Sequence, residues 1–260
     1  MKIVVLMKPV PDTWGPRVLS LETGLADRAA SETVLDEIGE RALEAALRHA
    51  ESASDVEVVV LTMAPEAAQA TLRKGLAMGA ASAVHVADER LAGADLGRTA
   101  EVLAAALRRG GFDLVIAGDA STDGVGGVLV PWLAELLDVP AITRLESLEI
   151  TADAVRGTRA TDGGSMVAQA ALPAIVSITE ALPDPRFPAL RGIMNAKKKP
   201  VEQLTLDDLE VEVEADETAS PRSIMTAVAE RPPRAAGEII TDEGDAGERI
   251  AAFLADRRLA

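Results

Sequence analysis

The sequence has no cysteine and only two histidines among its 260 residues. Without cysteine, the chain forms no disulfide bonds and offers no thiolate ligands to a metal ion. The histidines, His49 and His85, cannot supply a three-histidine metal site, and both lie in segments with apolar periodicity. We interpret both as ordinary structural residues.

Aromatic residues make up only 2% of the chain, and tyrosine is absent. The core must therefore consist mainly of alanine, valine, leucine and isoleucine, and aromatic stacking cannot be the means of holding nucleic-acid bases. Basic residues are also few, and the net charge of −16 repels phosphate polymers and anionic lipid surfaces. We expect no nucleic-acid partner and no membrane insertion, whereas basic patches on other proteins fit this charge.

Long hydrophobic runs are lacking too. The apolar run at the N-terminus is too short for a signal peptide or a membrane span, and Lys8 and Pro9 end it. A cytoplasmic protein is therefore expected. Hydrophobic residues make up 48% of the 27.1 kDa chain, which is enough for a sizeable core in a domain of α/β size.

Strand and helix patterns alternate along the first half of the chain. Residues 3–7 form a short apolar run, rich in β-branched side chains, that is typical of a strand buried on both faces of a parallel sheet. Further strands are predicted over 56–63, 83–87 and 112–117, and helices over 34–51, 65–78, 97–109 and 128–137. These alternations predict an α/β fold with right-handed crossovers and a mostly parallel sheet that carries helices on both faces.

The helix over 34–51 shows the clearest amphipathic pattern, with Thr33 as its expected N-cap. Its apolar stripe comprises Leu35, Ile38, Ala42, Ala46 and His49. Charged residues lie off this stripe, namely Glu37, Glu40, Glu44, Arg48 and Glu51. The pattern predicts one face against the sheet.

The pattern changes after Pro140. Short strands over 145–150, 154–159 and 166–171 predict an antiparallel insertion with a turn at 162–164, and residues 174–179 return to the core sheet. An acidic segment follows over 201–220, and Pro232 and Pro233 mark a linker before a last helix over 245–258. We expect a domain over 1–230 and an arm over 231–260, which either packs on another subunit or folds back on its own domain.

Ligands of open parallel sheets bind at the carboxyl ends of the strands, so the loops there matter most. The loop at 8–13 carries no glycine-rich fingerprint, and its two prolines suit a rigid turn. The loop at 118–127 is rich in glycine and precedes a helix, which suits a phosphate cradle. Its carboxylates, Asp119 and Asp123, repel phosphate unless they face ribose hydroxyls or cap the helix.

Residues 185–190 place Leu190 shortly after two prolines. An exposed leucine in such a setting is a stiff hydrophobic projection that loses little entropy on docking, and the alternative is a leucine buried in its own core. The lysines at 197–199 are interpreted as a solvated patch. Neither a nucleophile–base pair nor a metal-ligand spacing stands out, so the residues predict no enzyme active site.

Residues 184–199 read D-P-R-F-P-A-L-R-G-I-M-N-A-K-K-K, which closely resembles the signature E-P-R-Y/F…I-M-x-A-K-K-K of electron transfer flavoprotein beta subunits. Matching stretches cover nearly the whole chain, including 8–13 (K-x-V-P-D-T), 121–124 (S-T-D-G) and 162–164 (D-G-G). The resemblance implies a Rossmann-like domain, similar to adenine nucleotide alpha-hydrolases, that pairs with an alpha subunit. It also implies an electron carrier rather than an enzyme.

The resemblance implies cofactors and partners as well. FAD is expected mainly on the alpha subunit, with its ring near Thr13, and AMP is expected in the beta subunit as a structural ligand. Electrons are expected from acyl-CoA dehydrogenases of fatty acid beta-oxidation and related flavin dehydrogenases, and they pass to a membrane quinone oxidoreductase. Two alternatives stay open: a bifurcating variant with a second FAD in place of AMP, and a stand-alone ATP-binding sensor domain of the universal-stress type.

Carried over residue by residue, the resemblance assigns a nucleotide pocket and a docking surface. The pocket comprises Leu6, Thr33, Val34, Leu35, Asp36 and Met63 with Gly118, Asp119, Ala120, Ser121, Thr122, Asp123, Gly124, Val125, Gly126, Gly127, Val128 and Leu129. The docking residues lie in a recognition loop at about 178–200 and are Pro185, Arg186, Phe187, Leu190, Ile193, Met194, Lys197 and Lys198. Leu190 matches the leucine that inserts into a dehydrogenase pocket, and the C-terminal arm matches one that wraps the alpha subunit.

The chain departs from the family pattern in three places. Gly127, Val128 and Leu129 stand where many members have Asn-Gln-Thr, so only backbone N–H groups remain there to bind phosphate. Thr33 replaces another common asparagine, and Ala160 replaces a glutamate that helps to hold the movable alpha domain in some members. The first two departures leave the choice between AMP and a second FAD open.

Overall fold

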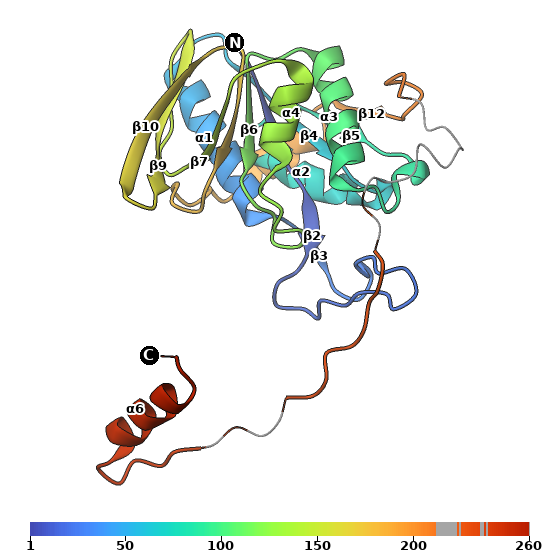
Figure 1. The fold of residues 1–260 in the computed structure, drawn as a ribbon. Helices are drawn as coiled ribbons and strands as arrows, with labels where there is room; N and C mark the ends of the chain where they lie inside the picture. Colours follow the sequence, from blue (N-terminus) through green and yellow to red (C-terminus); the bar gives the residue numbers. More distant parts are fainter. Residues whose placement is uncertain (212–222, 224, 235–236, 238, 260) are drawn as a thin grey trace. The chain divides into compact units, whose positions relative to one another are not determined.

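In the computed structural model, the structure describes residues 1–211, 223, 225–234, 237 and 239–259. The chain divides into two compact units, Met1–Thr226 and Ala227–Ala260. The first unit contains the central sheet with its covering helices, and the second contains the last helix (Figure 1). Most of the predicted acidic segment, residues 212–220, lies outside the described residues.

A seven-stranded sheet forms the centre of the first unit, in the order β12-β5-β4-β1-β6-β11-β7 (Figure 1). All neighbouring pairs run parallel. The strands are β1 (Lys2–Leu6), β4 (Glu57–Met63), β5 (Ser82–Val86), β6 (Leu114–Gly118), β7 (Ala141–Leu145), β11 (Ala174–Ile178) and β12 (Val201–Leu204). The predicted α/β fold is confirmed.

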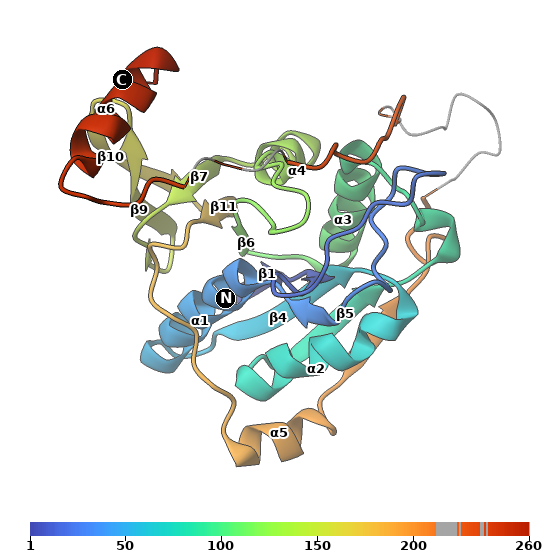
Figure 2. The same ribbon diagram turned by 90° about the horizontal axis from the view of Figure 1, so that it is seen from below.

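Helices cover both faces of this sheet (Figure 2). They are α1 (Glu37–Ser52), α2 (Gln69–Met78), α3 (Leu96–Gly110) and α4 (Leu129–Leu137), with short 3₁₀ turns η1 (Glu66–Ala68) and η2 (Glu89–Leu91). Successive side chains of a strand point to opposite faces. Ile3 and Val5 therefore pack with α1 and α2, whereas Val4 and Leu6 pack with α3 and α4. Burial on both sides explains why β1 is a continuous apolar run.

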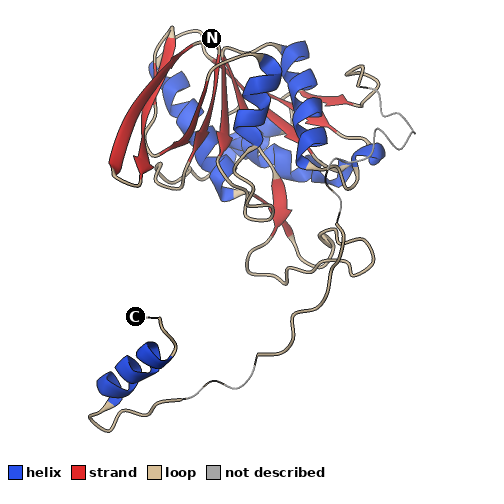
Figure 3. Ribbon diagram, in the orientation of Figure 1, coloured by secondary structure: helices blue, strands red, loops and turns tan. Residues whose placement is uncertain are grey.

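Two smaller antiparallel sheets extend from the body (Figure 3). One consists of β8 (Glu149–Ile150), β9 (Ala154–Thr161) and β10 (Gly164–Ala171), with Thr161 paired to Gly164 across the predicted turn. The other pairs β2 (Pro9–Pro11) with β3 (Thr33–Leu35). The predicted antiparallel insertion is thus confirmed, but the strand predicted over 145–150 is not a single strand. Leu145 ends β7, the parallel edge strand of the central sheet, and only Glu149–Ile150 forms β8.

The predicted start of the first helix was wrong. Thr33 does not cap a helix but pairs with Pro11 in the small sheet, and Asp36 is the residue that precedes α1. Tertiary pairing with Val10 decides this local choice, because a β-branched Thr-Val pair suits a strand.

Three other elements complete the described structure. The edge strand β12 pairs with β5 at the start of the segment expected to be merely acidic, and α5 (Leu190–Ala196) forms within the predicted proline-rich loop. In the second unit, α6 (Ala246–Asp256) agrees with the predicted last helix, and its Phe253 ring lies 5.1 Å from the Arg257 guanidinium. Within the described ranges, the longest and most apolar helices fall short of what a membrane crossing requires.

Candidate functional site

The strand order of the central sheet reverses beside β1, because β4 flanks it on one side and β6 on the other. In open α/β sheets, ligands bind outside the carboxyl ends of the strands at such a reversal. The loop after β1 and residues 118–129 after β6, called here the nucleotide loop, meet at this point. Lys8 Nζ lies 2.7 Å from Asp123 Oδ1 and 3.4 Å from Ser121 Oγ.

The backbone of the nucleotide loop is shaped by small residues and two left-handed positions. A Cβ on Gly118 would overlap the side chain of Ile38, so glycine lets α1 approach the end of β6. Val125 has φ 50° and Gly127 has φ 64°. The loop then enters α4, whose N-terminus has no side-chain cap. An uncapped helix start presents backbone N–H groups and a partial positive charge.

Both carboxylates that argued against phosphate binding are paired within the chain. Asp123 contacts Lys8 and, at 2.8 Å, the Nη2 atom of Arg28. Burial alone would raise the pKa of the Asp123 carboxyl, but the hydrogen bond and charge of Lys8, with help from Ser121 and Arg28, hold that pKa well below its usual range. Asp123 therefore stays ionised, and its charge is balanced locally.

Asp119 is held by a second network that spans three strands. Ser177 Oγ donates to Asp119 Oδ1 at 2.9 Å and accepts from the backbone N–H of Arg144 at 2.9 Å. Arg144 Nε lies 3.9 Å from Asp119 Oδ2, and the residue has φ 62°. With this left-handed backbone conformation, the Arg144 side chain points toward Asp119 of the nucleotide loop.

Asp36 connects the start of α1 to the nucleotide loop. The side chain is buried, and its Oδ2 accepts a hydrogen bond of 3.1 Å from the Thr122 N–H. Burial raises the pKa of Asp36, the Thr122 hydrogen bond opposes this, and the negative charge of Asp123 raises it further. Asp36 Oδ1 and Thr122 Oγ1 are buried without a hydrogen-bond partner in the described part of the chain. This acceptor and this hydroxyl suit a ligand with polar groups.

The remaining predicted pocket residues lie at or near the carboxyl-terminal ends of the strands. Leu6 and Met63 end the adjacent strands β1 and β4, and Leu6 packs into the core on the α3 side. Of the β3 residues, Leu35 is buried, Val34 is half-buried and Thr33 is exposed. Thr13 is exposed beyond β2. The structure brings Asp36 and the nucleotide loop into direct contact through the Thr122 N–H.

Arg17 and Arg28 are functional-site candidates that sequence reasoning missed. Both come from the long excursion at 12–32, and Arg17 Nη1 donates to the Thr122 carbonyl at 3.1 Å. Arg28 Nη1 also donates to the Pro9 carbonyl at 3.4 Å. A single arginine in a polar loop carries no recognisable signal, because its partner lies about a hundred residues away in the sequence.

The recognition loop exposes most of the residues that were predicted to dock, whereas Pro185 and Arg186 are half-buried. Leu190 begins α5 and is 74% exposed, and Phe187 is 96% exposed. Ile193 and Met194 are exposed as well. Leu190 is thus not buried in the core of its own domain, which was the alternative interpretation.

The three lysines at the end of the recognition loop are not equivalent. Lys197 and Lys198 are exposed, in keeping with a solvated patch. Lys199 instead donates to the carbonyl oxygens of Leu76 at 2.9 Å and Ala80 at 2.5 Å, and burial lowers its pKa. Lys199 therefore has a structural role at the end of α2.

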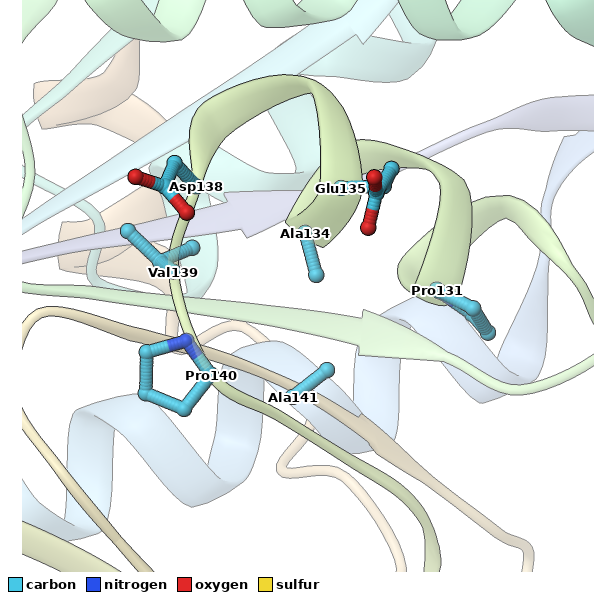
Figure 4. Close-up of a pocket in the computed structure, with 7 residues that line it drawn as sticks. All are labelled: Pro131, Ala134, Glu135, Asp138, Val139, Pro140 and Ala141. Atoms are coloured by element: carbon cyan, nitrogen blue, oxygen red, sulfur yellow. The ribbon is translucent and has the colours of Figure 1, made fainter.

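A cavity of about 400 Å³ lies near the amino-terminal end of β7, away from the strand ends that carry the nucleotide loop (Figure 4). It is lined by Pro131, Ala134, Glu135, Asp138, Val139, Pro140 and Ala141, between the end of α4 and the start of β7. In a parallel sheet, all strands begin on one side and end on the other. The cavity at the start of β7 is therefore separate from the nucleotide loop, which follows the end of β6.

Neither histidine belongs to the nucleotide loop or to the recognition loop. His85 is fully buried with Nε2 2.9 Å from the Ala64 carbonyl oxygen, and His49 lies partly buried in α1. In the described ranges, no group of three or more histidine, aspartate or glutamate side chains could hold a metal ion. These positions agree with a structural interpretation of both histidines.

The parallel sheet, its covering helices and the loops that meet at the order reversal define a Rossmann-like α/β protein. The family model of the electron transfer flavoprotein domain matches residues 23–209. Electron transfer flavoprotein subunit beta of Mycobacterium leprae (strain TN) is 45% identical over 262 residues, which cover 99% of this chain and 98% of that protein. The chain therefore belongs to the electron transfer flavoprotein family, as a beta subunit.

Two further relatives show the breadth of this similarity. The beta subunit of Bacillus subtilis (strain 168) is 34% identical, with 94% of this chain and 93% of that protein covered. Subunit CarD of the caffeyl-CoA reductase-Etf complex of Acetobacterium woodii is 32% identical, with 93% and 92% covered. The family works in electron transfer, and its beta subunits generally pair with an alpha subunit.

Proposed function

We propose that this chain forms a heterodimer with an electron transfer flavoprotein alpha subunit and serves as the docking subunit of an electron carrier. Acyl-CoA dehydrogenases and related flavin dehydrogenases dock on the recognition loop, and a membrane quinone oxidoreductase receives the electrons. The observation that carries this proposal is the outward position of Leu190, which is 74% exposed beside the exposed Phe187. A cytoplasmic location stays a prediction.

The nucleotide loop is the proposed site of AMP. Asp36 Oδ1 and Thr122 Oγ1 are polar atoms without a partner in the described structure, and they suit ribose hydroxyls. Backbone N–H groups near Gly126 and Gly127 and the uncapped start of α4 suit the phosphate. A side chain at Gly126 would meet nothing within 4 Å, so the loop has open space there.

FAD, held mainly by the alpha subunit, supplies the redox centre when it is bound. The contribution of this chain is to position that subunit and the dehydrogenase relative to each other. Thr13 is exposed next to Trp14, which is 96% exposed, so this region is accessible to a partner. The family match favours this carrier over a stand-alone ATP-binding sensor.

Release of bound nucleotides tests the assignment of the nucleotide loop. The chain is co-expressed with its alpha-type subunit, the complex is purified, and the released nucleotides are separated and quantified. One FAD and one AMP per heterodimer are expected. Two FAD and no AMP would instead identify a bifurcating variant, and a failure to form any flavin-containing complex would contradict the proposed function.

The docking role is tested by Leu190→Ala in the purified heterodimer. Loss of a buried interface side chain costs roughly 1–3 kcal/mol, so reduction by an acyl-CoA dehydrogenase at low concentration should slow about tenfold or more. FAD content should not change. The matched control is Leu21→Ala, which truncates an exposed leucine outside the recognition loop. Unchanged reduction kinetics for Leu190→Ala would refute the docking role.

A further inference from the structure

One face of α1 carries four charged side chains; three of them contact the beginning of the recognition loop, and Arg48 pairs with Glu44. Arg41, Glu44, Arg48 and Glu51 are spaced three or four residues apart, so they lie on one side of the helix. Arg41 donates to the Leu182 carbonyl at 2.6 Å and pairs with Asp184 at 2.5 Å. The sequence indicated only that the charged residues of α1 lie off its apolar stripe, so this contact surface emerges from the structure.

Arg186 is the centre of this contact. Its Nε donates to Glu44 Oε2 at 2.7 Å, and its backbone N–H donates to the same oxygen at 3.2 Å. Its Nη2 donates to Glu44 Oε1 at 3.2 Å and to Glu51 Oε2 at 3.1 Å, and Nη1 pairs with Glu51 Oε1. One planar guanidinium thus joins two carboxylates that are two helical turns apart.

Glu44 makes this arrangement specific to arginine. Its side chain is only 5% exposed, and burial alone would raise its pKa, but hydrogen bonds from Arg186 and Arg48 lower it. A buried carboxylate is costly without such donors. Lysine has a single ammonium group and cannot reproduce the paired donors of a guanidinium.

The other end of the recognition loop is held by α2. Arg73 donates to the Ala196 carbonyl at 3.0 Å, and Lys199 donates to the carbonyl of Leu76 in α2 and to that of Ala80 just beyond the helix. Gly192 lies so close to the Ala77 carbonyl that a Cβ there would overlap it. Two helices of the body therefore fix the two ends of the recognition loop.

Between these contacts, the apolar side chains of Phe187 and Leu190 project outward. Their place relative to the sheet is set by the two ends of the recognition loop and not by burial of the side chains themselves. Fixing a docking side chain before contact reduces the entropy lost on binding. Arg186 lies four residues before Leu190, and its backbone N–H is bonded to Glu44. Loss of the contacts of Arg186 is therefore expected to loosen the segment that carries Leu190.

We propose that Arg186 is a positioning residue for docking: held by Glu44 and Glu51 of α1, it fixes the recognition loop so that Leu190 meets the dehydrogenase in a single orientation. This inference rests on the proposed docking role of Leu190. Arg186 itself is half-buried against α1 and acts through Leu190, so the recognition chemistry remains that of an apolar pocket on a flavin dehydrogenase.

Steady-state reduction of the heterodimer by an acyl-CoA dehydrogenase tests the proposal, with the heterodimer as the varied substrate. Arg186→Ala should raise the KM for the heterodimer roughly tenfold, with kcat and FAD content unchanged, because a small misplacement of a contact group weakens productive docking. Arg186→Lys should give an intermediate KM. Glu51→Gln should also raise the KM, but by less. Because the Glu51 side chain is 61% exposed, this variant is expected to fold normally.

A double-mutant cycle separates positioning from general destabilisation. If Arg186 acts through Leu190, adding Arg186→Ala to Leu190→Ala should cause little further rise in KM. Additive effects, or a fall in kcat and FAD content with normal KM, would overturn the proposal. Should Arg186→Ala fail to fold, Glu51→Gln in the Leu190→Ala background gives the same decision. An unchanged KM for Leu190→Ala refutes the docking function itself. If Leu190→Ala raises the KM but Arg186→Lys and Glu51→Gln leave it normal, only the positioning role of Arg186 is refuted.

Discussion

At the scale of single residues, the pKa values of Asp36 and Asp123 are shifted in opposite directions although both carboxyls lie at the nucleotide loop. Burial raises the pKa of both carboxyls. In Asp123, hydrogen bonds from Lys8, Ser121 and Arg28 and the charge of Lys8 outweigh burial and lower the pKa. In Asp36, the backbone donors Thr122 and Ile38 do not offset burial and the negative charge of Asp123, so the pKa is raised. Ionised Asp123 therefore stabilises the folded chain, and ionised Asp36 is tolerated at a cost.

Asp123→Asn tests this contribution through the free energy of unfolding. Because the folded-state pKa lies below the ordinary value of 3.8, the carboxylate stabilises the fold at neutral pH, and this stabilisation is lost as the pH falls from that value through the folded-state pKa. We expect the variant to be about 2 kcal/mol less stable at neutral pH, from lost charged hydrogen bonds. Urea unfolding at several pH values should show the difference shrinking in acid, and a difference independent of pH would contradict the argument.

Asp138 carries backbone strain at the end of α4. It follows the helix with φ 54° and ψ 49°, the left-handed conformation that favours glycine. Its side chain is exposed, so little packing is lost when it is removed. Asp138→Gly should raise the free energy of unfolding by about 1 kcal/mol, measured by urea denaturation. Asp138→Ala serves as the control, because alanine suffers the same strain; an equal gain in both variants would assign the effect to lost charge.

At the scale of elements, the sequence predicted those whose pattern is decided locally. Strand β1 is a continuous apolar run buried on both faces, and α2 ends at Met78, as predicted. Strands β3 and β12 were missed because pairing with β2 and β5 creates them, and a single sequence does not display such partners. Short α5 is likewise stabilised by its packing on α2 rather than by its own composition.

Gly157 shows how closely one element of the antiparallel insertion approaches another. A Cβ at this position of β9 would overlap the Ser147 carbonyl oxygen and contact Leu145. The backbone there cannot yield as a flexible side chain would. Gly157→Ala should therefore lower the free energy of unfolding by about 3 kcal/mol, measured by urea denaturation of the purified chain.

The control for this prediction lies at the tip of the same hairpin. A Cβ on Gly163 would meet nothing within 4 Å. Gly163→Ala should leave the stability nearly unchanged, which separates the steric effect from the general effect of replacing glycine. Similar losses in both variants would mean that crowding against Ser147 is not the cause.

At the scale of the whole molecule, the location of the candidate site could be predicted but its cations could not. Alternating strands and helices imply ligand loops at the carboxyl ends of the strands, and the loops after β1 and β6 do meet at the order reversal. Arg28 and Arg144 reach Asp123 and Asp119 through tertiary folding alone. The same holds for Glu44, whose burial depends on Arg186 far along the chain.

The second unit offers an apolar helix side for a partner. Ile250 and Phe253 of α6 are partly exposed, and within α6 no described residue is buried. Burial of two such side chains contributes about 3 kcal/mol or more, equivalent to roughly a hundredfold in affinity. A chain that ends at Thr226 should therefore bind the alpha subunit about a hundredfold more weakly, measured by titration and by the mass of the complex in solution.

The same truncation decides between the two interpretations of the arm. If the arm binds the alpha subunit, the shortened chain keeps its thermal stability, because the first unit contains the complete central sheet and both core clusters. If the arm instead folds back on its own domain, the shortened chain melts at a lower temperature while heterodimer affinity changes little. A full-length variant with Ile250→Ala and Phe253→Ala keeps the length of the arm and removes its apolar contacts. Weak binding by the truncated chain but not by this variant would assign the arm's contribution to other contacts along its length.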